Sequence, residues 1–258
     1  GMKLVTGPTG SGKTTTLYAA LGQIKTRTKN IDTVDNPVQY SIDGINQVQT
    51  NERAGVTFAS GLRSILRQDP DVILVGEVRD RETAQIAFDA ALTGHLVLST
   101  VHTDSAAGAI IMLLELDMEP YLISETIIGI IAQRLVRRVC EKCKTLYHPP
   151  KELLDMLGLK EKDVSAKKIY KAVGCHMCNN TGYKGRIAIF EIIKMEPEIR
   201  GQISSKISEK ALIDIGKMTG MKTLRESGIE KVFDGITTPE EVLRVTYEEK
   251  ETVFSCPR

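Results

Sequence analysis

The stretch GPTGSGKT, residues 7–14, constrains the fold of this chain more than any other. It matches the pattern G-x-x-x-x-G-K-[ST] and lies between an apolar run at residues 2–6 and a segment with helical spacing at 13–25. A strand, a glycine-rich loop and a helix in that order turn backbone N–H groups toward a phosphate at the helix N-terminus. The alternative is a glycine-rich turn that binds nothing, but the flanking strand and helix favour a phosphate loop.

The same motif assigns roles to its side chains. Lys13 would reach the β- and γ-phosphates of ATP, and the Thr14 hydroxyl would bind Mg²⁺. The residues expected to contact the nucleotide are Gly7, Pro8, Thr9, Gly10, Ser11, Gly12, Lys13, Thr14 and Thr15.

Beyond the loop, apolar strand-like segments alternate with helical ones. The expected strands are residues 31–34, 71–76 and 95–102, and a helix is expected at 81–94. This alternation predicts an α/β fold with a parallel-rich sheet covered by helices. After residue 104 the pattern becomes helical as far as residue 139, and the basic run at 134–138 is interpreted as a solvated helix end.

Three consecutive parts are expected along the chain. They are a nucleotide-binding core at 1–139, a cysteine-containing subdomain at 140–194 and a helical C-terminal region at 195–258. The middle part is Lys-rich, and we expect it to be irregular with a short helix of its own. Thr238 and Pro239 are typical of a helix start, so the last helix should begin there.

Composition narrows the class of partner rather than the fold. Of 258 residues, 41% are hydrophobic and 26% are charged, and 34 basic residues balance 33 acidic ones. A net charge of +1 gives no support to nucleic acid or an anionic membrane as a partner, so no nucleic acid is expected. The apolar stretches are too short for a bilayer span and no signal peptide is evident, so we expect a cytoplasmic protein with no transmembrane segment.

Polar side chains at the ends of expected strands are further candidates. Glu77 follows the strand at 71–76, where a carboxylate would lie near the phosphates; alone, it would be an ordinary acid at a helix start. His95 and His102 flank another strand at opposite ends, which argues against a metal pair. Either histidine could contact a γ-phosphate, or both could be structural.

Two arginines could reach a neighbouring subunit's nucleotide. Arg63 and Arg67 are four residues apart on an expected helix, which would place them on one face. The alternative is that both are ordinary surface charges.

Four of the five cysteines form two C-x-x-C pairs, with residues 144–174 between them. Four thiolates favour a closed, structural Zn²⁺ site in a reducing compartment, while an iron–sulfur cluster is possible on ligand type alone. His148 and His176 could replace one thiolate, and Cys256 is left as a free thiol. The cysteines expected to bind the metal are Cys140, Cys143, Cys175 and Cys178.

Several long motifs together resemble the secretion ATPase superfamily, and within it the type II secretion and type IV pilus assembly ATPases. The motifs are GPTGSGKTTTLYAAL, GVTFASGLRSILRQDPDVILVGEVRD, TGHLVLSTVHT, the paired cysteines, TGYKGRIAIFEI and GITTPEEVLRVT. Retraction ATPases of the superfamily generally lack the tetracysteine insert, so its presence favours assembly or secretion. The resemblance implies a RecA-like ATPase that works as a homo-hexamer against an inner-membrane platform protein and extrudes pilin or pseudopilin subunits.

The resemblance also implies roles for individual residues. Residues 7–14 match the phosphate loop, Glu77 the Walker B acid, and His95 with His102 the histidine box. Residues 35–40 fall on the aspartate box, whose usual form is Thr-Val-Glu-Asp-Pro-Val-Glu.

This chain departs from the aspartate box at Asp35, Asn36 and Gln39. If the first acid aligns the attacking water, Asp35 is one methylene shorter, about 1.5 Å of reach. A misplacement of that size costs on the order of a hundredfold in rate. Asn36 and Gln39 keep hydrogen-bonding shape but lose charge. A nucleotide-binding subunit that hydrolyses ATP poorly or not at all is therefore the alternative to a working ATPase.

The start of the chain is a second departure from the family. Members place an N-terminal domain before the phosphate loop, and here six residues precede Gly7. We therefore expect a fragment or a truncated gene product that is monomeric or loosely associated in solution.

Overall fold

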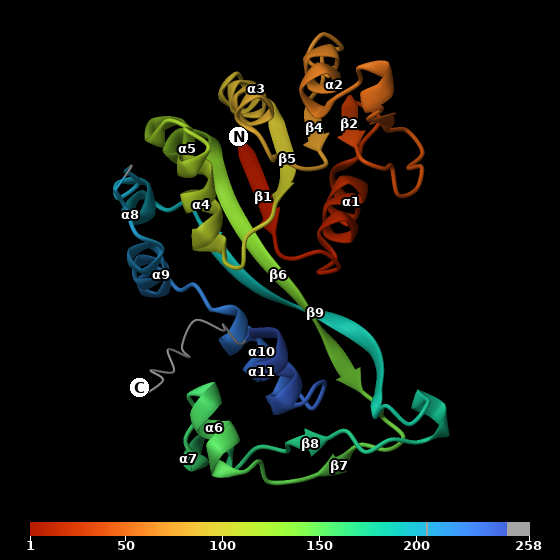
Figure 1. The fold of residues 1–258 in the computed structure, drawn as a ribbon, viewed down its shortest axis with the longest axis vertical. Helices are drawn as coiled ribbons and strands as arrows, with labels where there is room; N and C mark the ends of the chain where they lie inside the picture. The colour runs from red at the N-terminus through yellow and green to blue at the C-terminus, as the bar shows by residue number, and fades with distance from the viewer. Residues whose placement is uncertain (205, 247–258) are drawn as a thin grey trace, which may run out of the picture. The chain divides into compact units, whose positions relative to one another are not determined.

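The computed structural model describes residues 1–204 and 206–246, and Cys256 lies outside them. These residues form two compact units, each built from separate segments of the chain (Figure 1). Unit 1 comprises Gly1–Gln133 and Phe190–Met221, and unit 2 comprises Arg134–Ile189 and the described residues from Lys222 onward. The units therefore do not follow the three consecutive parts expected from the sequence, because the chain returns to unit 1 after the cysteine pairs.

A seven-stranded sheet contains the strands that the phosphate motif requires. Its order is β3 (Asn46–Gln49), β2 (Ile31–Asp35), β4 (Val72–Val75), β5 (Leu96–Val101), β1 (Met2–Thr6), β6 (Ile127–Val139) and β9 (Tyr183–Lys194). The pairings of β1 with β5 and β6, of β2 with β3 and β4, and of β4 with β5 are all parallel. Parallel strands end at a common edge, so the residues that follow β1, β2, β4 and β5 are brought together there.

Helices cover both faces of this sheet in unit 1. Helix α1 (Lys13–Ile24) buries Leu17, Tyr18 and Leu21 against Val5, Leu74 and their neighbours on one face. On the other face lie α2 (Phe58–Ile65) and α3 (Arg81–Leu92). The remaining helices of this unit are η1 (Glu52–Ala54), α4 (Ala106–Glu115), α5 (Pro120–Thr126), α8 (Pro197–Arg200) and α9 (Glu209–Met218). The predicted α/β fold with a parallel-rich sheet is confirmed.

The helical pattern predicted as far as residue 139 is wrong beyond Thr126. From Ile127 the chain is the long strand β6, which pairs with β1 in the register Lys3↔Gly129 and Thr6↔Ala132. The isoleucine-rich start of this segment favours a strand. An apolar run alone does not distinguish a helix from a strand, and here pairing with β1 stabilises the strand. The basic run at 134–138 therefore lies in a strand and not at a helix end.

Unit 2 holds the cysteine pairs and the last two helices. Two short strands, β7 (Thr145–Leu146) and β8 (Tyr170–Lys171), pair antiparallel, and α6 (Lys151–Leu157), α7 (Glu161–Val164) and η2 (His176–Cys178) lie near them in sequence. Helix α10 (Leu224–Phe233) and helix α11 (Pro239–Thr246) complete the unit. The predicted start of the last helix at Pro239 is confirmed. The small core of this unit comprises Leu154, Leu157, Val164, Ile169, Ile229, Val232 and Val242.

Candidate nucleotide site and cysteine cluster

The loop between β1 and α1 has the backbone that a phosphate cradle needs. Gly7, Gly10 and Gly12 all have positive φ angles, of 146°, 80° and 87°, which residues with a side chain rarely adopt. A Cβ at Gly7 would lie 2.4 Å from the backbone oxygen of Gln133, so no side chain fits there. Pro8, Thr9 and Gly10 are exposed, and the helix begins at Lys13, with Thr14 and Thr15 in its first turn.

Lys13 is folded onto its own loop. Its Nζ donates to the backbone oxygens of Gly7 at 2.6 Å and Pro8 at 3.2 Å, and it lies 3.5 Å from Nδ1 of His102. The ammonium group is therefore already within the cradle that the glycines form, which is where a phosphate loop lysine must act.

Gln133 on β6 braces the loop, and the sequence interpretation missed it. Its Nε2 donates to the backbone oxygen of Ser11 at 2.6 Å, and its Oε1 accepts from the Thr16 hydroxyl at 2.7 Å. The side chain is only 2% exposed. One amide thus ties the end of the loop to the first turns of α1. A polar residue within an apolar run was the available signal. Because this segment was predicted to be a helix, the side to which the Gln133 side chain points could not be inferred.

His102 lies between Lys13 and Glu77. Glu77 lies two residues after the end of β4, and His102 lies directly after β5. Because the two strands are parallel, both residues lie at the same edge of the sheet. The Nε2 of His102 is 3.4 Å from Oε2 of Glu77, while its Nδ1 faces Nζ of Lys13. A neutral imidazole with its proton on Nε2 donates to Glu77 and accepts from Lys13. Arg79 also contacts Oε2 of Glu77, at 2.7 Å.

His95 lies at the opposite end of β5 from His102. Its Nδ1 is 2.9 Å from the backbone oxygen of Ala90, and the start of β5 is paired with the start of β1. The phosphate loop follows the other end of β1. Within this chain the structure therefore brings His102, and not His95, to Lys13.

Asp35 ends β2 beside the residues that precede Glu77. It is 3% exposed, and its Oδ2 accepts a hydrogen bond of 3.1 Å from the Tyr18 hydroxyl. Burial raises the pKa of the Asp35 carboxyl above its ordinary value, and the hydrogen bond from Tyr18 opposes that rise. A Cβ on Gly76 would lie 3.1 Å from Oδ1 of Asp35, so the missing side chain leaves room for the carboxylate.

The two amides that follow Asp35 are exposed. Asn36 precedes Pro37, and the Gln39 side chain donates to the backbone oxygen of Pro37 at 3.4 Å. The backbone N–H of Gln39 donates to the Tyr18 hydroxyl at 3.4 Å. Tyr18 thus links Asp35 to the turn that follows it.

The two arginine candidates do not share a helix face. Arg63 lies on α2 and contacts Glu82 at 2.5 Å, whereas Arg67 lies in the turn after α2 ends at Ile65. The prediction of a common helical face for Arg63 and Arg67 is therefore wrong, because the helix ends at Ile65, two residues before Arg67. Both side chains are exposed.

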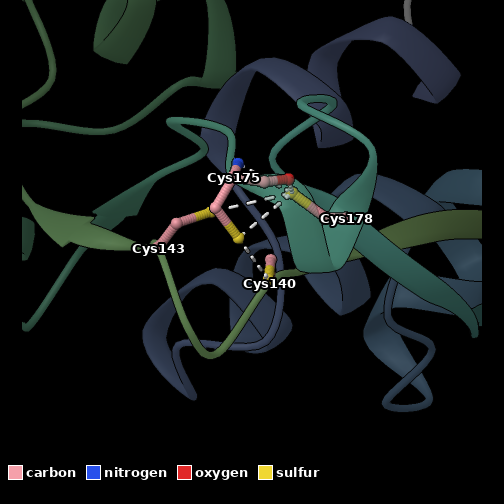
Figure 2. A group of neighbouring side chains, drawn as sticks. All are labelled: Cys140, Cys143, Cys175 and Cys178. Carbon is pink, nitrogen blue, oxygen red and sulfur yellow. Dashed lines mark hydrogen bonds between the residues drawn. The ribbon is translucent and has the colours of Figure 1, made fainter.

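The four paired cysteines meet in unit 2 (Figure 2). Their sulfur atoms lie within 4.8 Å of one another, with separations of 3.9 Å for Cys140 and Cys175 and 3.8 Å for Cys143 and Cys178. Four sulfurs each about 2.3 Å from a central Zn²⁺ would be about 3.8 Å apart in a tetrahedron. These residues therefore fit a single tetrahedral ion, and the group of candidate ligands found among the described residues consists of these cysteines, without His148 or His176.

Backbone N–H groups donate hydrogen bonds to two of the four sulfurs. Gly174 donates to Sγ of Cys143 at 3.3 Å, and Cys175 and Gly182 each donate to Sγ of Cys178 at 3.2 Å. Burial raises the pKa of the Cys178 thiol, but the backbone donors of Cys175 and Gly182, together with the thiols of Cys175 and Cys143, outweigh it and lower the pKa to about 6. The thiolate form that metals bind is thereby favoured at Cys178, whereas burial and the neighbouring thiols raise the pKa of Cys143 to about 11.

With this geometry established, comparisons with known proteins place the chain in a family. Residues 1–244 match the family described as type II/IV secretion system protein. The chain belongs to this family. Of its relatives, the type IV pilus assembly ATPase PilB of Thermus thermophilus is 53% identical over 248 residues, 96% of this chain and 28% of that protein. The type II secretion system protein E of Pseudomonas aeruginosa is 49% identical over 249 residues, 96% of this chain and 49% of that protein.

A solved structure of a relative agrees with the fold. The pilus retraction motor PilT with bound ADP aligns with a TM-score of 0.71 at 29% identity, over 97% of this chain and 62% of that one. The chain spans half or less of the two curated relatives described above. Within residues 1–204 and 206–246, no helix has the length and apolar character that crossing a membrane requires.

Proposed function

We propose that this chain is the ATP-binding motor portion of a type IV pilus assembly or type II secretion ATPase, and that it hydrolyses ATP with Mg²⁺. The observation that carries the proposal is the position of His102 between Lys13 of the phosphate loop and the carboxylate of Glu77. The names of the relatives, a pilus assembly ATPase and type II secretion system proteins, support the motor role. The ADP in the PilT structure supports the nucleotide.

In this proposal each residue at or near the phosphate loop has a defined role. Backbone N–H groups of residues 7–14 hold the phosphates, and Lys13 moves from the carbonyl oxygens of its own loop to the β- and γ-phosphates. Glu77 orients the attacking water. His102 faces Lys13 with Nδ1 and Glu77 with Nε2, and the move of Lys13 to the phosphates frees Nδ1 to contact the γ-phosphate. The Thr14 hydroxyl would hold Mg²⁺, which when bound neutralises charge on the phosphate oxygens.

Asp35 supports a second candidate function, a subunit that binds ATP but hydrolyses it slowly. Its carboxylate is buried and already bonded to Tyr18, so it is less free to hold the attacking water. Asn36 and Gln39 add no charge to compensate.

The whole machine is also part of the proposal. We expect a homo-hexamer that acts on an inner-membrane platform protein from the cytoplasmic side and moves pilin or pseudopilin subunits. The exposed Arg63 and Arg67 would then be available to a neighbouring subunit, and any role of His95 lies away from this chain's own phosphate loop. The four cysteines would hold a structural Zn²⁺.

The deciding experiment is steady-state turnover of Mg²⁺-ATP by the purified chain, with nucleotide affinity measured alongside and Lys13→Ala as the blank. Turnover above the blank supports a working ATPase. Binding without turnover supports the slow subunit, and the triple variant Asp35→Glu, Asn36→Asp, Gln39→Glu should then raise the rate if the altered box is the cause. A chain that binds neither ATP nor ADP would overturn both candidates.

A further inference from the structure

The His102 loop, residues 102–105, is fixed to the base of the phosphate loop. Thr6 is the last residue of β1 and directly precedes Gly7. The backbone N–H of Thr103 donates to the Thr6 hydroxyl at 2.8 Å, and the two threonine hydroxyls are also 2.8 Å apart. Any displacement of the His102 loop therefore acts on the strand that leads into the phosphate cradle.

Two carboxylates hold the other end of the His102 loop. Glu191 on β9 accepts from the backbone N–H of Ala106 at 2.8 Å, and Glu209, the first residue of α9, accepts from the Ser105 hydroxyl. Ser105 and Ala106 form the start of α4, and α9 packs against α4. Both glutamates belong to residues 190–221, the segment that returns to unit 1 after the cysteine pairs.

These contacts exceed what a helix start requires. Ser105 already caps α4 by accepting from the N–H of Gly108 at 2.8 Å. Glu191 is only 5% exposed, and a carboxylate is retained at such a position only when donors compensate for lost water. The backbone N–H of Ala106 and the positive dipole end of α4 supply part of that compensation.

Gly108 makes room for the second carboxylate. A Cβ at this position would lie 3.2 Å from Oε1 of Glu209 and 3.0 Å from the Ser105 hydroxyl. A glycine within a helix costs about 1 kcal/mol relative to alanine, and here it admits the carboxylate.

We propose that Glu191 and Glu209 are positioning residues that hold His102 against the phosphate loop, so that residues 190–221 respond to nucleotide. This inference rests on the proposed function, because it needs a nucleotide at that loop. Because Glu209 of α9 is bonded to Ser105, a movement of α9 displaces Ser105 and with it His102, which lies three residues earlier in the chain. Coupling between two sites is reciprocal, so nucleotide at Lys13 must also change the stability of α9 against α4.

Hydrogen exchange with and without Mg²⁺-ADP, or a non-hydrolysable ATP analogue, tests the coupling. In the unmodified chain, nucleotide should slow exchange in the phosphate loop and also in α9, the latter about fivefold or more. Glu209→Ala should abolish the slowing in α9 and retain it in the loop. Glu209→Gln keeps an acceptor oxygen and should restore most of the effect. The exposed Glu198, on the same segment, supplies the matched control Glu198→Ala.

A second variant avoids removing the carboxylate. Gly108→Ala favours the helix but crowds Glu209, so it should also reduce the nucleotide response of α9. Protection of the phosphate loop with no response in α9 of the unmodified chain, or an equal response in Glu209→Ala, would overturn this inference alone. If nucleotide protects no part of the chain, the proposed function fails together with it.

Discussion

The side-chain amide of Gln133 donates to the backbone oxygen of Ser11 at 2.6 Å, which joins the strand β6 to the phosphate loop. The same side chain accepts from Thr16 on α1, so one buried residue spans the loop and the helix that follows it. The shape of the cradle therefore depends on a strand that begins more than a hundred residues later in the chain.

Replacing Gln133 should loosen this cradle. Gln133→Ala leaves the Ser11 carbonyl and the Thr16 hydroxyl without these partners, which should cost about 1–3 kcal/mol in the free energy of unfolding. We also expect about a tenfold loss of ADP affinity, measured by calorimetry, since tenfold corresponds to about 1.4 kcal/mol. Gln202→Ala, an exposed glutamine in the same unit, is the control. Equal ADP affinity in Gln133→Ala and the unmodified chain would count against this role.

His102 should matter more for turnover than for binding. His102→Ala removes the group between Lys13 and Glu77 and should lower kcat about a hundredfold, the usual scale for one lost hydrogen-bonding partner of a transition state. The KM for ATP should change much less, because the backbone cradle remains. His148→Ala, at an exposed position in unit 2, is the control. A rise in KM at unchanged kcat would contradict this assignment.

The charge cluster around Glu241 should make unit 2 sensitive to acid. Burial raises the pKa of Glu241, but hydrogen bonds from Arg244 and Arg137 outweigh it and lower the pKa to about 2. A lowered folded-state pKa contributes stability above the ordinary value of 4.5, and this contribution is lost as the pH falls from there toward 2. Its size is at most about 3 kcal/mol, reduced by solvent at the two partly exposed arginines.

Glu241→Gln should therefore lower the urea midpoint at pH 7 and reduce its dependence on pH below 4.5. Glu152→Gln, an exposed position in the same unit, controls for the change of net charge. If both variants lose the same stability at pH 7 and at pH 3, the buried cluster is not the cause.

Removal of the metal should loosen unit 2 and leave nucleotide binding intact. We expect one Zn²⁺ per chain, and chelation should speed hydrogen exchange across residues 140–178, because binding a structural metal is coupled to folding. The effect should extend to residues 235–236, which are bonded to the neighbours of the first cysteine pair. The backbone N–H of Val139 donates to the backbone oxygen of Ile236, and Nζ of Lys144 donates to the backbone oxygen of Gly235. Cys178→Ser should reproduce the effect without chelator. Loss of ADP binding on chelation would contradict this separation.

The sequence alone determined the features that depend on neighbouring residues. The glycines of the phosphate loop, the helix that starts at Lys13, the strand before Glu77 and the two cysteine pairs are all local, because turn geometry, helix periodicity and short metal-binding loops involve few residues. Their alternation also sufficed to predict a parallel-rich sheet.

Only the tertiary structure decided what those elements contact. Residues 127–139 could form a helix or a strand, and pairing with β1 made them a strand. Thr6 contacts Thr103, which lies 97 positions later in the chain, and Ser105 contacts Glu209, which lies 104 positions later. No local sequence pattern specifies such pairs. The altered residues around Asp35 were visible in the sequence, but the bond to Tyr18 and the burial of the carboxylate were not. Long-range packing fixes these positions, because burial and hydrogen bonding are satisfied across the whole fold rather than within one segment.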